Sequence, residues 1–211
     1  MSDTTIEGRA VRLEALGPHH FEDVCRAVCH DDGFAQTAFM IEQPPREEAA
    51  RLPWFLKKIA WDGRVYFACV DPVSGRARGL LTFQRDEAAH RSIEIGDVLF
   101  GVGLQRTPAA TEAVYLLLRH AFEEMKYRRV EWKCDTRNGA SYRAAERFGF
   151  TFEGVFRQHM IIRGQSRDSA WFSMLDHEWP ARRRAFERWL SIDNFDDAGM
   201  QKTPLAAFHR V

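Results

Sequence analysis

Apolar and polar positions in the middle of the chain follow patterns that predict a strand, a helix and a second strand. Residues 93–100 are mostly apolar or β-branched and run into glycines, which is typical of a strand entering a turn. Thr107 and Pro108 suit the N-cap and first residue of a helix, and apolar residues then recur at helical spacing over 109–125. Residues 129–134 alternate with a period of two. If the two strands are parallel neighbours, the helix begins at the carboxyl end of the first.

The same criteria predict the other elements, and their mixture indicates an α/β class with a mixed sheet. Residues 31–45 show no clear period and predict a connecting loop or lid, for which a plain connection packed by its aromatic residues is the simpler interpretation. The predicted strands cover 11–15, 65–70, 78–84, 92–99, 151–162 and 169–175, and the predicted helices open near 18 and cover 46–61, with a kink or restart at Pro53, 139–148 and 182–190.

The start of the helix that follows Pro108 is a candidate anion site. Amide groups at Ala109, Ala110 and Thr111 would point out of the helix, where its dipole favours a phosphate, and Arg106 adds a positive charge. An ordinary capped helix with solvated side chains is the alternative for this segment taken alone.

A second motif makes the interpretation more specific. Asn138 and Gly149 have the positions of an N-cap and a left-handed C-terminal residue around a short helix. Gln105 and Arg106 before small residues that open a helix, then a strand, then Asn138-x-x-Ser141 and a closing Gly-Phe, resemble the GNAT superfamily of acyl-CoA-dependent N-acetyltransferases. More narrowly, the chain resembles the RimJ/RimL branch, which includes ribosomal-protein N-terminal acetyltransferases.

The resemblance covers residues 10–179 and implies a fold. Its element order is β-α-α-β-β-β-α-β-α-β-β, with a central mixed, mostly antiparallel sheet and one parallel strand pair. We therefore expect one acyltransferase domain over residues 1–190. Residues 191–211 are polar and rich in Asp, and we expect a loosely attached tail there.

The resemblance also implies acetyl-CoA as co-substrate. The pyrophosphate of CoA would lie at residues 105–111, which include Gln105 and Thr107. The pantetheine arm would pair with the first crossover strand, where a backbone amide around Val98, Leu99 or Phe100 would stabilise the oxyanion.

Three residues are expected to have catalytic roles. Ser141 would protonate or hydrogen-bond the departing thiolate, with Tyr142 as the fallback, while Asn138 would fix the turn and contact the pantetheine arm. Glu94 is the chosen carboxylate for attracting or deprotonating the amine, although such carboxylates are more often structural or solvated. Asp97 and Glu131 are the other carboxylates considered.

Two positions depart from the superfamily pattern. Pro108 stands where the phosphate loop has its first glycine, which removes one amide that could contact a phosphate. Ala145 stands where many members have a tyrosine acid, and Ser141 is the usual substitute in this branch. Both departures lend some weight to the alternative of a non-catalytic acyl-CoA-binding or interaction module.

Composition bears on the binding partners, the cellular compartment and the state of the cysteines. Thirty basic residues balance thirty acidic ones, so no overall field favours nucleic acid or an anionic membrane. No apolar run approaches a membrane span and residues 1–9 lack a signal-peptide pattern, so we expect a cytoplasmic protein. Four cysteines without a CxxC pair predict reduced thiols, and the proximity of Cys25, Cys29 and His30 is too common a coincidence to predict a metal.

The leading interpretation is an acetyl-CoA-dependent N-acetyltransferase that moves an acetyl group to a primary amine by direct transfer in a ternary complex. The acceptor would be a protein N-terminus or a small amine, and a homodimer is one option for the assembly. A structural domain without a ligand is the third and least favoured interpretation.

Overall fold

The computed structural model describes residues 4–60 and 63–209. The chain forms two compact units, the first ending at Leu117 and the second beginning at Leu118.

The first unit contains five strands, each paired antiparallel with the next in chain order. Apolar side chains alternate along β2 and fill β3, which explains why these residues form a half-buried and a buried strand. The strands are β1 (Thr5–Glu7), β2 (Arg12–Ala15), β3 (Arg64–Val70), β4 (Ala77–Glu87) and β5 (Ser92–Phe100), with a short 3₁₀ helix η2 (Ala88–His90) between the last two. The sequence did not predict β1, because three residues are too few for an alternation to be recognised.

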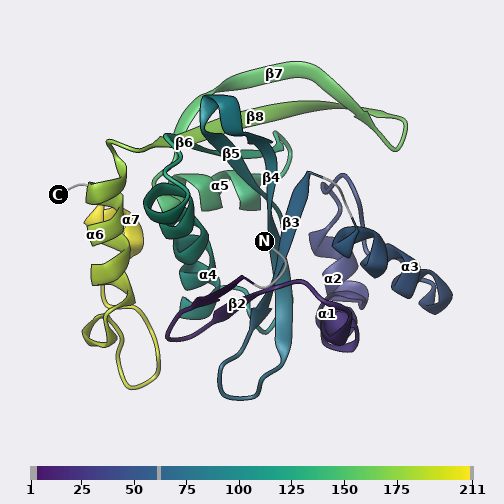
Figure 1. The fold of residues 1–211 in the computed structure, drawn as a ribbon, viewed down its shortest axis with the longest axis horizontal. Helices are drawn as coiled ribbons and strands as arrows, with labels where there is room; N and C mark the ends of the chain where they lie inside the picture. Colours follow the sequence, from purple (N-terminus) through teal and green to yellow (C-terminus); the bar gives the residue numbers. More distant parts are fainter. Residues whose placement is uncertain (1–3, 61–62, 210–211) are drawn as a thin grey trace. The chain divides into compact units, whose positions relative to one another are not determined.

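Three helices pack beside this sheet, and Figure 1 shows them gathered next to β3. They are α1 (Phe21–Val28), preceded by η1 (Pro18–His20), then α2 (Asp31–Gln36) and α3 (Glu48–Ile59). The side chains of Val24 and Val28 from α1 and Phe55 from α3 are buried in one core cluster with Leu80 of β4. The two predicted helices α1 and α3 therefore pack their apolar side chains against this sheet.

Two expectations for this region are wrong. Residues 31–45 do not form a plain loop, because α2 occupies their first part and Gly33 lies where a Cβ would come within 2.1 Å of the Val28 carbonyl oxygen. The expected restart at Pro53 is also absent, since α3 is one helix that contains this residue. Local periodicity could not reveal α2, which is only six residues long.

The helix α4 (Pro108–Arg119) anchors the connection between β1 and β2. The buried carboxylate of Glu112 accepts hydrogen bonds from the backbone amides of Arg9, Ala10 and Val11 at 3.0, 2.6 and 3.1 Å. Three otherwise unpaired amides are satisfied by one charged group, which makes each bond stronger than a neutral one.

The second unit contains three antiparallel strands in the order β6-β8-β7. Its elements are the π-helical turn η3 (His120–Glu124), β6 (Arg129–Asp135), α5 (Gly139–Phe148), β7 (Thr151–Ile162), β8 (Gln165–Leu175), α6 (Trp179–Leu190), η4 (Ile192–Asn194) and α7 (Leu205–Phe208). The sequence predicted β6, α5, β7, β8 and α6, although β8 begins four residues and α6 three residues earlier than expected, and it did not predict α7.

The C-terminal segment is not loosely attached as far as residue 209. Leu205 of α7 is fully buried. The Asn194 amide group donates to the carbonyl oxygens of Trp189 and Thr203, both at 3.1 Å, and its oxygen accepts from the Thr203 amide at 3.0 Å. One buried asparagine therefore fixes the turn that brings α7 back to α6, an arrangement that polar composition alone did not reveal.

Cys25, Cys29, Cys69 and Cys134 are all free and buried. Within the described ranges, no helix is long and apolar enough to cross a membrane.

Candidate functional site

The loop between β5 and α4 has the cap that its sequence predicted. The Thr107 hydroxyl accepts from the Ala110 amide at 3.3 Å and donates to the Leu104 carbonyl at 2.6 Å. Because α4 begins at Pro108, the backbone amide of Thr111 already has a hydrogen-bond acceptor within the helix, and Thr111 is buried. The expectation of three outward amides is therefore wrong, and only that of Ala109 lacks both an intrahelical acceptor and the cap.

The two polar side chains of this loop differ in orientation. The Gln105 amide donates to the Phe100 carbonyl at 2.8 Å and also to the Gln36 side chain, so it ties the loop to the end of β5 and to α2. Arg106 is exposed and has a left-handed φ of 58°. Of the two, Arg106 is therefore the one available to an anion.

Strand β5 contains an irregularity just before this loop. Thr82 of β4 pairs with Gly96 and Leu80 pairs with Leu99, so a single residue of β4 faces both Asp97 and Val98. This is a β-bulge, and such an extra residue leaves a backbone group out of the ladder. It lies within the stretch that the sequence resemblance marked for the oxyanion amide.

The side chain of Asp97 is the centre of a buried charged group. Its Oδ2 accepts from the Tyr66 hydroxyl at 2.5 Å and from Arg64 Nη1 at 2.8 Å, and Lys58 Nζ lies 4.0 Å away. Lys58 is only 3 % exposed and also contacts Glu42 at 3.1 Å. Burial, followed by the Asp97 charge, raises the pKa of Tyr66, so this hydroxyl stays a donor at neutral pH.

Glu94 lies on β5, three residues before Asp97 of the bulge. Its carboxylate is almost fully buried and accepts from the Gln84 side-chain amide at 2.7 Å, with Arg85 Nε at 3.5 Å. A base in this environment would exchange protons with an amine only through a connected hydrogen-bond chain or a water. Glu131 instead pairs with Arg129 at 2.8 Å, which is a structural role.

In the second unit, Asn138 and Ser141 meet on the first turn of α5. The Asn138 side-chain oxygen accepts from the Ser141 amide at 3.1 Å, and Gly149 ends the helix with a left-handed φ of 88°. Both caps were predicted. The Ser141 hydroxyl accepts from the Trp132 indole at 3.0 Å, so it is oriented by a β6 side chain.

Tyr142 and His159 have other surroundings. The Tyr142 ring packs edge-on against Phe172 with centroids 4.8 Å apart. His159 Nδ1 lies 2.9 Å from the Ser169 hydroxyl, and the ring contacts Trp171.

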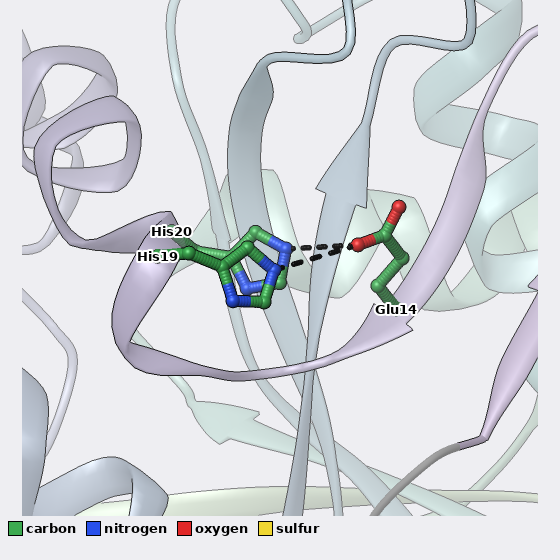
Figure 2. Close-up of side chains that lie close together, drawn as sticks. All are labelled: Glu14, His19 and His20. Carbon is green, nitrogen blue, oxygen red and sulfur yellow. Dashed lines mark hydrogen bonds and ion pairs between the residues drawn. The ribbon is translucent and has the colours of Figure 1, made fainter.

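Among the described residues, one group has the composition of a metal site, and none of its members was predicted to be functional. Figure 2 shows both His19 and His20 directed at Glu14, with Nε2 to Oε2 distances of 3.7 and 3.1 Å. However, His20 Nδ1 accepts from the Gly17 amide at 3.1 Å, so the proton of the neutral ring is on Nε2. A metal at Nε2 would have to displace it, so a hydrogen bond to Glu14 fits this geometry better.

A family model described as Acetyltransferase (GNAT) domain matches residues 10–151, which is more than half of the chain. The chain therefore belongs to the GNAT acetyltransferase family. The match includes β5 with its bulge, the start of α4, and α5 with Asn138 and Ser141. The family inferred from the sequence motifs is thus confirmed.

Solved structures match this GNAT protein over a larger part of the chain than the family model does. A GCN5-related N-acetyltransferase from Brucella melitensis is 43% identical, with a TM-score of 0.96 over 100% of this chain and 96% of that one. A probable GNAT-family acetyltransferase from Chromobacterium violaceum is 41% identical, with a TM-score of 0.80 over 86% and 90% of the two chains. The expected α/β class of the GNAT fold is therefore confirmed.

A curated relative matches about half of the chain. The protein named "Putative ribosomal N-acetyltransferase YdaF" of Bacillus subtilis (strain 168) is 28% identical over 52% of this chain and 59% of its own length. The GNAT chain thus spans about three fifths of that relative.

Proposed function

We propose that this protein is an N-acetyltransferase that moves an acetyl group from acetyl-CoA to a primary amine by direct transfer in a ternary complex. The observation that carries the proposal is the family match over residues 10–151, which includes every residue assigned to the site from sequence. The acceptor is a protein N-terminus or a small amine, and the RimJ/RimL-like motifs favour the N-terminus.

In the first step, the neutral amine attacks the thioester carbonyl carbon, and negative charge develops on the carbonyl oxygen. A backbone amide of the β5 bulge, at residues 97–98, supports this role because an amide that is out of the ladder can donate to the oxygen. Val98, Leu99 and Phe100 provide the backbone along which the pantetheine arm lies. Glu94 acts on the amine proton through water, since its carboxylate is buried.

In the second step, the bond from carbon to sulfur breaks and the thiolate of CoA leaves with the electron pair. The Ser141 hydroxyl accepts from Trp132 and donates to the Cys134 sulfur, so in the proposed step its proton turns from Cys134 to the departing thiolate. The Asn138 side chain holds the turn that places Ser141. The proton lost by the amine balances the proton gained by the thiolate.

The CoA pyrophosphate is assigned to residues 105–111, where Arg106 supplies charge and Ala109 an outward amide, while Gln105 and Thr107 fix the loop. Ala110 and Thr111 would contact the pyrophosphate only by van der Waals packing. The amide of Ala110 already donates to the Thr107 hydroxyl, and that of Thr111 donates within the helix.

The proposal is tested by incubating the protein with acetyl-CoA and a panel of peptides with free N-termini, matched peptides with blocked N-termini, and small amines. Mass spectrometry should detect acetylation of at least one free amine and of no blocked peptide. CoA binding by calorimetry without acetylation or acetyl-CoA hydrolysis would instead identify the non-catalytic module. Absence of CoA binding would refute both functions.

A further inference from the structure

The bulge of β5 contains a residue whose backbone is strained. Asp97 has a φ of 42°, in the left-handed region that glycine adopts freely and other residues adopt at a cost of about 1 kcal/mol. Aspartate tolerates this region better than most residues, but the turn or bulge around it still has to hold it there. The contacts of Asp97 therefore decide how well the bulge is fixed.

Those contacts come from β3, which lies on the far side of β4 from β5. The Tyr66 hydroxyl donates to Asp97 Oδ2 at 2.5 Å, and Arg64 Nη1 donates both to the same oxygen at 2.8 Å and to the Tyr66 oxygen at 3.1 Å. The three side chains thus close a small hydrogen-bonded ring. With Tyr66 3 % and Asp97 10 % exposed, water competes little for these bonds.

We infer that Tyr66, Arg64 and Asp97 form a clamp that fixes the β5 bulge and so orients the backbone amide of residues 97–98 toward the thioester carbonyl of acetyl-CoA. This inference rests on the proposed function. The three side chains are positioning residues: they act through the backbone of β5 and need not touch the substrate.

The clamp matters because an amide stabilises an oxyanion only when it points at the oxygen before the reaction starts. Loss of a clamp bond lets the bulge relax toward other conformations, which weakens the contact with the carbonyl but leaves the rest of the CoA site intact. Acetyl-CoA has this carbonyl and CoA does not. The preference for acetyl-CoA over CoA therefore reports on the clamp.

The experiment uses the full chain, with [1-¹³C]acetyl-CoA and CoA as probes. NMR measures the ¹³C shift of the bound carbonyl, which moves downfield when the carbonyl accepts a hydrogen bond, and calorimetry measures both dissociation constants. Tyr66→Phe removes one clamp bond and keeps the ring. Asp97→Gly removes the carboxylate while favouring the left-handed backbone, and Asp97→Asn keeps both an oxygen acceptor and that backbone.

We expect Tyr66→Phe and Asp97→Gly to lose part of the downfield shift and to lower the preference for acetyl-CoA over CoA by about three- to tenfold, the range of one hydrogen bond. Asp97→Asn should retain an intermediate shift. Tyr127→Phe is the control, because it removes the hydroxyl of another buried tyrosine, in the second unit, and should change neither quantity.

The outcomes separate the two hypotheses. Unchanged carbonyl shifts and preferences in folded Tyr66→Phe and Asp97→Gly variants that still bind acetyl-CoA would overturn the clamp and leave the proposed function intact. Equal losses of acetyl-CoA and CoA affinity would also overturn it, because they indicate general damage to the site. Absence of acetyl-CoA binding by the wild-type protein would overturn the proposed function and the clamp with it.

Discussion

Replacing Ser141 with alanine tests whether its hydroxyl acts in the reaction or only in the fold. The helix cap of α5 survives this change, because Asn138 accepts from the backbone amide of residue 141 and not from its hydroxyl. The change removes the hydrogen bond that the Trp132 indole donates to the Ser141 hydroxyl at 3.0 Å, and Trp132 is buried. An unpaired buried donor costs about 1–3 kcal/mol of unfolding free energy.

The kinetic effect should be separate from this loss of stability. We expect kcat to fall at least roughly tenfold, which is about 1.4 kcal/mol of barrier, if the hydroxyl stabilises the departing thiolate. The dissociation constant of CoA should stay within about threefold, since the contact matters mainly as the carbon–sulfur bond breaks. Steady-state rates with the acceptor found in the peptide panel and calorimetry with CoA measure the two quantities.

Two further variants make the result specific. Ser173→Ala removes another buried hydroxyl of the same unit, one that donates to Glu153 at 2.7 Å, and should lower stability without lowering kcat. Trp132→Phe should give a smaller kcat loss, because Ser141 remains but is no longer oriented. Wild-type kcat in Ser141→Ala, with chemistry shown to limit the rate, would remove Ser141 from the mechanism and leave Tyr142 or a water as the proton source.

Three other perturbations address binding and stability. Arg106→Glu should weaken CoA by about tenfold in calorimetry, because it reverses a charge beside the pyrophosphate, and unchanged affinity would refute this placement. Phe39→Ala should raise the acceptor KM more than the acetyl-CoA KM, because the GNAT resemblance implies that residues 31–45 border the acceptor site and Phe39 is 37% exposed there; equal effects would contradict a role in acceptor binding. Burial, then Arg182, lowers the pKa of His209 to about 4, so the stability from its neutral form is complete above about pH 6.5 and is lost as pH falls toward 4. In urea titrations, acidification to roughly pH 4.5 should lower the free energy of unfolding of the wild-type protein by about 1–2 kcal/mol more than that of His209→Gln, because solvent screens part of the effect. Equal losses in the two proteins would refute the assignment.

The elements that the sequence predicted are those with a repeated signal. The period of two in β6, the helical spacing in α4 and the paired caps Asn138 and Gly149 of α5 each depend on neighbours a few residues apart, so one chain suffices to recognise them. Asn138 and Ser141 could be brought together for the same reason, because they share one helical turn.

The features that the sequence did not predict depend on residues far apart in the chain. A left-handed Asp97 has no local signature, since its conformation is held by Tyr66, which is 31 positions away. Similarly, nothing near Glu112 indicates that it would bind three amides from the connection between β1 and β2, about 100 positions away. Such contacts require the pairing of the strands to be known first.

The atypical start of α4 also allows a gain of function to be predicted. Pro108 has no amide hydrogen, and Thr107 already engages the amide of Ala110, so one outward amide and the charge of Arg106 remain for the pyrophosphate. Pro108→Gly would restore an amide at the first helical position, where an anion can accept from it.

We therefore expect Pro108→Gly to tighten CoA by about threefold, one modest hydrogen bond, and to lower thermal stability because proline is favoured at this position. Pro108→Ala is the matched variant, since it restores the same amide with less backbone freedom and should tighten CoA at least as much. Calorimetry with CoA and with pantetheine, which lacks the pyrophosphate, separates the phosphate contact from the rest of the site. If both variants bind CoA no better than the wild-type protein, the pyrophosphate does not lie against the first turn of α4.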